Sequence, residues 1–243
     1  MKRIMWFFAL LWAVGAASPA GAGILDDILE RLPDAKGTAS LAGPDQKTTI
    51  AGLKEALAVG TKNAVNALSK QDGYFGNELV KILLPEKVRT AADMASRLGF
   101  RKQVDRFTLS MNRAAEAAAP KAADLFADAI RDMSFEDARK ILQGGDTAAT
   151  DYFRARTSEK LYAAFKPAVA ANMNRVGVTK AYKDMMAPVE SLPLVPKESI
   201  DLDHYVTGKA LDGLFLMIGS EEKKIRTDPA ARVTDILKTV FGK

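Results

Sequence analysis

Residues 141–158, with the sequence ILQGGDTAATDYFRARTS, are the stretch whose residue types most suggest a site. Gly144 and Gly145 stand directly before a helix-like run, where free backbone N–H groups can bind a phosphate. A phosphate loop also needs a lysine and a hydroxyl after its glycines, and neither follows in that register. Asp146 is placed to cap the helix, so its carboxylate would occupy the same N–H groups. We therefore predict a helix corner, with Gly144 or Gly145 in the left-handed conformation that ends the preceding helix.

The helix predicted after this corner carries the first candidate polar residues. Ala149, Tyr152, Phe153 and Arg156 recur at the spacing of one helix face, so Arg156 is expected to share the inward face with apolar residues. An arginine there either extends to water or pairs with a carboxylate. Glu116, in the alanine-rich NRAAEAAAP, is the partner that we predict. A less favoured reading places Arg156 at the base of a ligand pocket. The candidate ligand-binding or structural polar residues are Tyr152, Arg156, Glu116 and Arg113.

Other chemistry-bearing residues favour structural roles. His204, the single histidine, follows Asp201 and Asp203 in the sequence DLDHYV, but a zinc site needs three or four ligands of such types. We predict no metal, no cofactor and no catalytic residue, and we expect Asp203 to cap a long helix. Glu222 and Arg226 stand four residues apart, the spacing of a pair on a solvated helix surface.

A set of methionine and aromatic residues leaves two readings open. Methionine adapts to irregular spaces, so these side chains could line an apolar cavity, although filling of the core is the favoured alternative. The set comprises Met173, Met185, Met186, Met217, Tyr182, Phe165 and Phe215.

The first 22 residues have the order of a secretory signal. A basic start, an apolar run over residues 4–14 and a small-residue stretch with Ala20-Gly21-Ala22 predict export and cleavage near Ala22. The apolar run is too short for a membrane span, which needs about 20 residues. Cleavage removes two of the 35 basic residues and none of the 30 acidic ones, so the net charge falls from +5 to +3. So small an excess of positive charge argues against a nucleic-acid-binding protein. The chain has no cysteine, which excludes disulfides and thiolate sites.

The remaining elements predict an all-α protein. Residues 23–47 are interpreted as a short amphipathic helix, over 24–32, followed by a flexible spacer. Residues 48–243 show helical periodicity almost throughout and no strand pattern, which predicts one compact all-α domain of about eight to ten helices. Ser134 with Asp137 predicts a helix cap. Three glycines in the long C-terminal helix, Gly208, Gly213 and Gly219, suggest close approach of a neighbouring helix. The prolines of residues 187–199 predict an extended segment.

Six blocks occur in an order that resembles a known bacterial family. The blocks are GLKEAL (52–57), DGY (72–74), NRAAE (112–116), GGDTAATDYFR (144–154), YVTGKALDGLF (205–215) and EEKKIRTDPAAR (221–232). Together they resemble the family called domain of unknown function 4197. The resemblance covers about residues 48–241 and implies an exported helical protein of Gram-negative bacteria. It supplies no catalytic residue.

These observations favour a periplasmic, non-enzymatic binding or interaction module. Its expected partner is an apolar small molecule, held in a groove between helices, or an envelope protein. The alternative is a hydrolase-like enzyme that uses carboxylates such as Glu116 and Asp212, although no motif marks its site. The segment 24–32 carries Asp26, Asp27 and Glu30 against one arginine, so we expect it to dock onto protein rather than onto an anionic membrane.

Overall fold

The computed structural model describes residues 46–190, 192, 200–232 and 238, and the structural statements below concern these residues. They form helices, turns and extended connections without a β-strand, within one domain spanning residues 44–243. The predicted all-α, single-domain fold is therefore confirmed. No helix in the described ranges has the length and apolarity that a membrane crossing requires. The predicted signal sequence and amphipathic helix lie outside the described residues.

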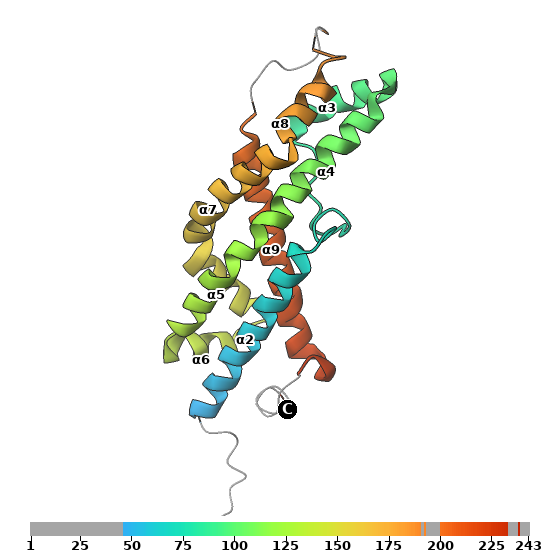
Figure 1. The fold of residues 1–243 in the computed structure, drawn as a ribbon. Helices are drawn as coiled ribbons and strands as arrows, with labels where there is room; N and C mark the ends of the chain where they lie inside the picture. Colours follow the sequence, from blue (N-terminus) through green and yellow to red (C-terminus); the bar gives the residue numbers. More distant parts are fainter. Residues whose placement is uncertain (1–45, 191, 193–199, 233–237, 239–243) are drawn as a thin grey trace, which may run out of the picture. The chain divides into compact units, whose positions relative to one another are not determined.

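The helices follow one another with short connections (Figure 1). In chain order they are α2 (Gln46–Ser69), α3 (Glu86–Ala95), the π-helix η1 (Ser96–Phe100), α4 (Arg101–Ala118), the 3-10 helix η2 (Ala119–Lys121), α5 (Ala122–Arg131), α6 (Phe135–Gln143), α7 (Ala148–Val176), α8 (Val178–Met186), α9 (Leu202–Thr227) and the 3-10 helix η3 (Pro229–Ala231).

Several of these helices meet without an intervening loop. Helix α3 passes into α4 through η1, where Gly99 has φ 92°, and α4 passes into α5 through η2. Gly177 has φ 73° and joins α7 to α8, a conformation that favours glycine because it has no Cβ. The helix number, expected at eight to ten, therefore depends on whether these joints count as breaks.

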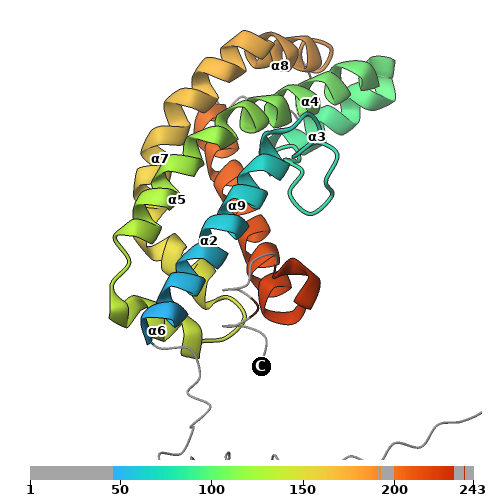
Figure 2. The ribbon, with the colours of Figure 1, turned by 60° about the horizontal axis from the view of Figure 1, so that its bottom comes forward.

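Helix α9 is the central element of the packing. It packs mainly against α7 and α2, and Figure 2 shows it running between them. The core includes Phe126 of α5, whose ring lies 5.3 Å from that of Phe153 on α7 and 6.3 Å from that of Phe215 on α9. Helix α6 contacts α2 at one end of the domain, and α3 contacts α8 at the other (Figures 1 and 2). These aromatic contacts join α5 to both α7 and α9.

The local predictions at the helix ends have mixed outcomes. The capping box of α6 is confirmed, because Ser134 Oγ accepts from the Asp137 N–H and the Asp137 carboxylate accepts from the Ser134 N–H. The cap of α9 is Asp201 rather than Asp203, since the Asp201 carboxylate accepts from the His204 N–H at 2.9 Å. Gly144 is extended, with φ −81° and ψ 175°, so the left-handed glycine predicted before α7 is wrong.

The connection between α2 and α3 departs most from the all-helical expectation. Residues 71–80 form turns and residues 81–85 are extended. Asp72 has φ 64°, the one positive value for a non-glycine residue in the described chain, and aspartate tolerates that conformation. The extended segment predicted over residues 187–199 forms turns over 187–190 and a bend at 192, and its other residues lie outside the described ranges.

Candidate functional site

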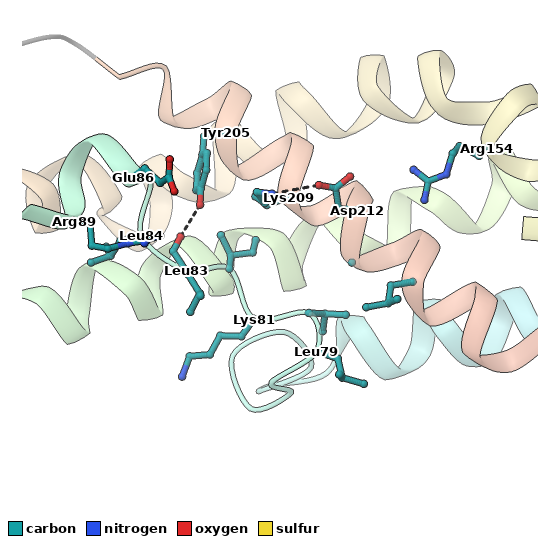
Figure 3. Close-up of a pocket in the computed structure, with 14 residues that line it drawn as sticks. Leu79, Lys81, Leu83, Leu84, Glu86, Arg89, Arg154, Tyr205, Lys209 and Asp212 are labelled. Atoms are coloured by element: carbon teal, nitrogen blue, oxygen red, sulfur yellow. Dashed lines mark hydrogen bonds and ion pairs between the residues drawn. The ribbon is translucent and has the colours of Figure 1, made fainter. Parts of the chain in front are cut away.

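A groove of about 630 Å³ lies between the connection after α2 and the exposed side of α9 (Figure 3). One wall is residues 79–84, and the other is formed by α9 from Tyr205 to Leu216. Its floor includes the buried Val80 and Ile82. The lining residues, which we call the groove, are Leu79, Val80, Lys81, Ile82, Leu83, Leu84, Glu86, Arg89, Arg154, Tyr205, Lys209, Asp212, Gly213 and Leu216.

Three leucines of the groove are unusually exposed. Leu79 is 75% exposed, Leu83 59% and Leu216 49%, although each is a large apolar side chain. A cluster of exposed apolar side chains in a hollow is typical of a surface that a partner covers. The sequence pattern that could have revealed this wall is the alternation of outward Leu79 and Leu83 with inward Val80 and Ile82.

The charged side chains of the groove are mainly cationic. Lys81, Arg89, Arg154 and Lys209 stand against Glu86 and Asp212. Lys209 lies 3.5 Å from Asp212, and the guanidinium of Arg154 lies 4.5 Å from the centre of the Phe215 ring. Because a cation over an aromatic face keeps its charge, Arg154 still attracts an anion. The groove therefore combines apolar contact area with a net positive rim.

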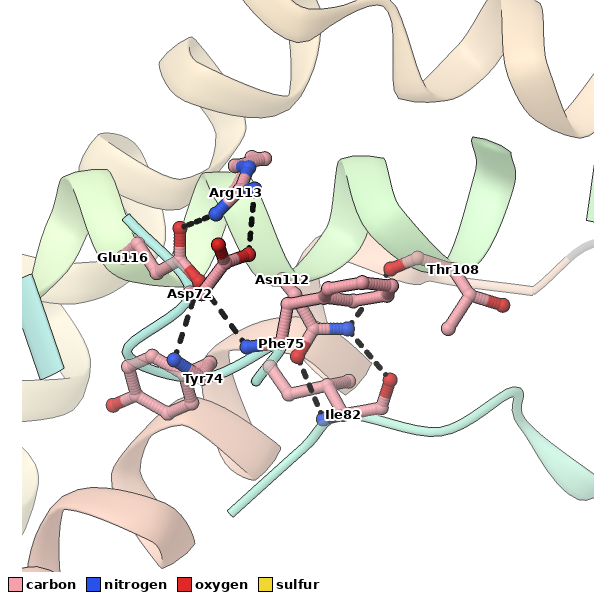
Figure 4. Close-up of polar contacts among 8 residues, drawn as sticks. All are labelled: Asp72, Tyr74, Phe75, Ile82, Thr108, Asn112, Arg113 and Glu116. Carbon is pink, nitrogen blue, oxygen red and sulfur yellow. Dashed lines mark hydrogen bonds and ion pairs between the residues drawn. The ribbon is translucent and has the colours of Figure 1, made fainter. Parts of the chain in front are cut away.

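Asn112 of α4 holds the extended wall of the groove (Figure 4). Its Oδ1 accepts from the Ile82 N–H at 2.8 Å, and its Nδ2 donates to the Ile82 carbonyl at 2.8 Å. The same Nδ2 donates to the Thr108 carbonyl. The side-chain amide thus pairs with Ile82 as a neighbouring strand would, which explains how a single extended segment keeps its position. From the other side, Tyr205 Oη donates to the Leu83 carbonyl at 2.9 Å (Figure 3).

The turn before this wall is held by the carboxylate of Glu116 (Figure 4). Glu116 Oε1 accepts from the Tyr74 and Phe75 N–H groups at 3.2 and 3.1 Å. Its Oε2 lies 2.6 Å from Arg113, which also contacts Asp72 at 2.7 Å. Burial alone would lower the pKa of Arg113, but hydrogen bonds and charge from Glu116 and Asp72 raise it. Glu116 and Arg113 are therefore brought together, as parts of a structural clamp.

Tyr74 connects the same turn to α9. Its side chain is fully buried, and its hydroxyl donates to the Ala210 carbonyl at 2.8 Å. Burial, with a further contribution from the charge of Glu116, raises the pKa of Tyr74 far above its usual value. Gly213 gives the turn its space, because a Cβ there would lie 3.0 Å from the Tyr74 ring and 3.1 Å from Val80. The close approach predicted at Gly213 is real, but the neighbour is a turn and not a helix.

The start of α7 is occupied by a carboxylate of the protein itself. Glu222 of α9 accepts from the Ala149 and Thr150 N–H groups at 2.9 Å each and from the Thr150 hydroxyl at 2.8 Å. Arg226 contacts the same carboxylate at 2.9 Å. The interpretation as a helix corner rather than a phosphate loop is thus supported, but the capping group is not Asp146. The prediction of a solvated Glu222–Arg226 pair is wrong, because their side chains are only 4% and 16% exposed.

Tyr152 and Arg156 lie together in a second hollow, of about 410 Å³. Arg156 is 61% exposed and lies 3.5 Å from Asp137, so the predicted inward position and the predicted Glu116 pairing are both wrong. The register places Arg156 at the edge of the buried face instead. Tyr152 Oη donates to the Ala129 carbonyl at 3.1 Å, and the Arg156 guanidinium lies 5.8 Å from its ring.

Electrostatics in this second hollow follow from local contacts. A hydrogen bond from the Ser134 hydroxyl and the charge of Arg156 lower the pKa of Asp137, while partial burial opposes them. Burial, together with the charge of Asp137, raises the pKa of Tyr152. We assign this cluster a role in joining α6 to α7.

The remaining candidates do not assemble into a reactive site. Among the described residues no group of His, Asp and Glu side chains is arranged to hold a metal ion. His204 Nδ1 instead lies 2.6 Å from the Tyr162 hydroxyl. Of the methionine set, Met173, Met185 and Phe165 are buried in the main core, and Met217 packs against it. Core filling therefore accounts for these side chains.

Comparison with known proteins places the chain in a family. The model of the family described as Protein of unknown function (DUF4197) matches residues 43–242, and the chain belongs to that family. No curated protein and no solved structure matches the chain.

Proposed function

We propose that this member of the DUF4197 family is an exported, periplasmic binding module whose groove takes an acidic, amphipathic segment of another polypeptide. The observation that carries the proposal is the grouping of Leu79, Leu83 and Leu216, each at least 49% exposed, inside a cationic rim. Export is supported by the basic, apolar and small-residue order of residues 1–23.

The form of the groove favours a polypeptide over a small apolar molecule. Its volume lies within the range of ligand pockets, about 300 to 1,000 Å³, but such pockets enclose most of their ligand. Here the leucine side chains face solvent along an open wall. Two further hollows, of about 540 and 430 Å³, adjoin it along α9 and share Asp212 with it. A helix or an extended chain can cover such a surface, whereas a single small molecule covers only part of it.

The charge of the groove selects among polypeptides. Arg89, Arg154 and Lys209 would meet acidic side chains, while the leucines would meet an apolar stripe between them. Complementary charge speeds encounter and rejects partners of like charge. An acidic amphipathic helix meets both requirements, because its two faces can satisfy the rim and the floor together.

No observation favours the hydrolase alternative. Glu116 is engaged by Arg113 and by two backbone N–H groups, so its oxygens are not presented to a substrate. Asp212 lies in the groove, paired with Lys209. The two carboxylates face different surroundings, whereas acid and base catalysis needs both at one bond.

A peptide titration tests the proposal. Fluorescence anisotropy would compare a labelled acidic amphipathic peptide with a peptide that keeps the apolar residues but has lysine at each acidic position. The acidic peptide is expected to bind at least about tenfold more tightly, and added salt should weaken it. The double variant Leu79→Ser, Leu83→Ser should lose binding, while Leu98→Ser, at another exposed leucine, should not.

Either of two results would overturn the proposal. One is equal affinity for the two peptides, which would remove the role of charge. The other is a groove variant that binds as well as the Leu98→Ser control. A small apolar molecule that copurifies with the protein and competes with the peptide would reassign the groove to that molecule.

A further inference from the structure

We infer that the occupant of the groove is the N-terminal segment of a second copy of this chain, residues 24–32, which we call the arm. The arm lies outside the described residues, so its chemistry is read from its sequence, ILDDILERL. The inference rests on the proposed function, because it names the acidic amphipathic segment that the groove would bind.

The arm has the chemistry that the groove requires. Its apolar stripe consists of Ile24, Leu25, Ile28, Leu29 and Leu32. Its other face carries three acids, Asp26, Asp27 and Glu30, against the single base Arg31. The groove has four cations and two anions among its lining residues. Opposite net charges and matching apolar surfaces therefore favour this pairing over a basic segment of the same hydrophobicity.

The length of the arm matches most of the α9 wall of the groove. From Gly208 to Leu216 the helix advances about 12 Å at 1.5 Å per residue. In the helical conformation predicted from its sequence, the nine-residue arm advances about the same distance. One arm would thus cover α9 from Gly208 to Leu216, which is most of the stretch from Tyr205 to Leu216 that lines the groove.

Gly208 provides a separate indication that another backbone approaches α9. A Cβ at Gly208 would meet nothing within 4 Å, in contrast to Gly213, where the turn occupies that space. Glycine within a helix costs about 1 kcal/mol relative to alanine. No contact among the described residues explains why glycine rather than alanine stands at position 208. Gly208 lies between the two hollows that adjoin the groove. A docked helix crossing α9 at this point explains the missing side chain.

The reach of the arm favours a second copy over its own chain. Residues 33–45, thirteen in number, connect the arm to Gln46 and span at most about 45 Å when fully extended. As a flexible coil they span about 20 Å. Helix α2, with 24 residues, places its two ends about 35 Å apart, and its Asn63 bonds Glu221, five residues after Leu216, so the groove lies toward the far end of α2. To reach its own groove, the linker would have to extend well beyond its flexible-coil span. Reciprocal exchange between two copies removes the need for each arm to run back along its own α2, and it closes at a dimer.

Sedimentation velocity on the exported chain tests this exchange over roughly 1 to 200 μM, which covers the affinity expected of a short segment. A concentration-dependent dimer is expected. Reversing the charge of the arm, Asp26→Lys with Asp27→Lys, should weaken the dimer at least about tenfold, and so should Arg89→Glu with Lys209→Glu. Combining the two pairs should restore most of the association.

Two further variants complete the design. Lys62→Glu with Lys121→Glu reverses two exposed charges outside the groove and should leave the dimer unchanged. Gly208→Ala should weaken the dimer while raising the unfolding temperature measured at a concentration where the chain is monomeric, a combination that general damage to the fold cannot produce.

A chain that stays monomeric across the concentration range would overturn the inference. The inference would also be overturned if the dimer dissociation constant stayed unchanged both in the arm variant, Asp26→Lys with Asp27→Lys, and in the groove variant, Arg89→Glu with Lys209→Glu. If the chain is monomeric but the groove still binds a separate acidic peptide, the arm is the wrong occupant and the proposed function stands. If that peptide also fails to bind, both are wrong.

Discussion

Replacing Gly208 and Gly213 by alanine, one at a time, should change the stability of the protein in opposite directions. Both glycines lie within α9, five residues apart, so the gain in helix propensity and the effect on the unfolded chain are about equal in the two variants. The difference between the variants therefore reports only the surroundings of the added methyl group.

The magnitude follows from what that methyl group would meet. At Gly208 nothing lies within 4 Å of the new Cβ, so the propensity gain of about 1 kcal/mol is retained. At Gly213 the Cβ would lie 3.0 Å from the Tyr74 ring and 3.1 Å from Val80 Cβ. Tyr74 cannot easily retreat, because it is buried and its hydroxyl is bonded to the Ala210 carbonyl. Overpacking of about 2 kcal/mol leaves a net loss of about 1 kcal/mol.

Urea denaturation followed by circular dichroism measures both free energies of unfolding, provided that the slope m is unchanged. The two variants should differ by about 2 kcal/mol, and their unfolding temperatures by about 4 to 8 °C for a domain of this size. Gly219→Ala is the matched control, because its Cβ would meet Thr150 at an ordinary 3.5 Å, and it should follow Gly208→Ala. A Gly213→Ala protein as stable as Gly208→Ala would refute the claim that the turn is seated tightly on α9.

Three other predictions concern buried contacts that hold the fold and the groove wall. Glu222→Gln should lower the free energy of unfolding by about 3 kcal/mol at neutral pH, because an amide cannot replace the carboxylate that accepts two N–H groups and pairs with Arg226. A urea denaturation midpoint equal to that of the wild type would contradict this. Tyr74→Phe should lower the free energy of unfolding by about 1 kcal/mol at pH 8, because it removes the hydrogen bond to the Ala210 carbonyl. The raised pKa of Tyr74 means that the folded state keeps a proton that the unfolded state loses above pH 10, so stability falls as pH rises. Between pH 8 and pH 11 the free energy of unfolding of the wild type should therefore fall by about 1.4 kcal/mol more than that of Tyr74→Phe. Equal decreases in the two proteins would argue against burial of this hydroxyl. Asn112→Ala should lower the free energy of unfolding by about 2 kcal/mol and weaken peptide binding, because the Ile82 N–H and carbonyl lose their partner. A peptide affinity equal to that of the wild type, measured by anisotropy, would show that Asn112 does not position the wall.

The features that the sequence predicted correctly are those determined over short distances along the chain. The all-α class follows from helical periodicity over more than 150 residues. The cap formed by Ser134 and Asp137 depends on residues three positions apart, so one short motif contains all of its information.

The features that were missed depend on contacts between distant residues. Asp146 was a reasonable local choice for the start of α7, but the buried Glu222, 72 residues away from Thr150, occupies those N–H groups. Periodicity reports which residues face inward and not which partner they meet. The inward position predicted for Arg156 failed because an arginine at the edge of a helix face is better solvated when it reaches outward to Asp137. The extended wall was missed because six residues are too few to separate strand-like alternation from a helical pattern.

The blocks that carry the family resemblance contact one another in the fold. Asp72 and Tyr74, from DGY, contact NRAAE through Arg113 and Glu116. Tyr74 also contacts YVTGKALDGLF at Ala210. These contacts hold the turn and α9, whereas Leu79, Leu83 and Leu216, which would touch a partner, lie outside the six blocks. The contact surface therefore has two parts, because the cationic residues Arg154 and Lys209 lie inside the blocks and the exposed leucines lie outside them. Substitutions at these leucines can change the apolar contacts with a partner without touching the turn.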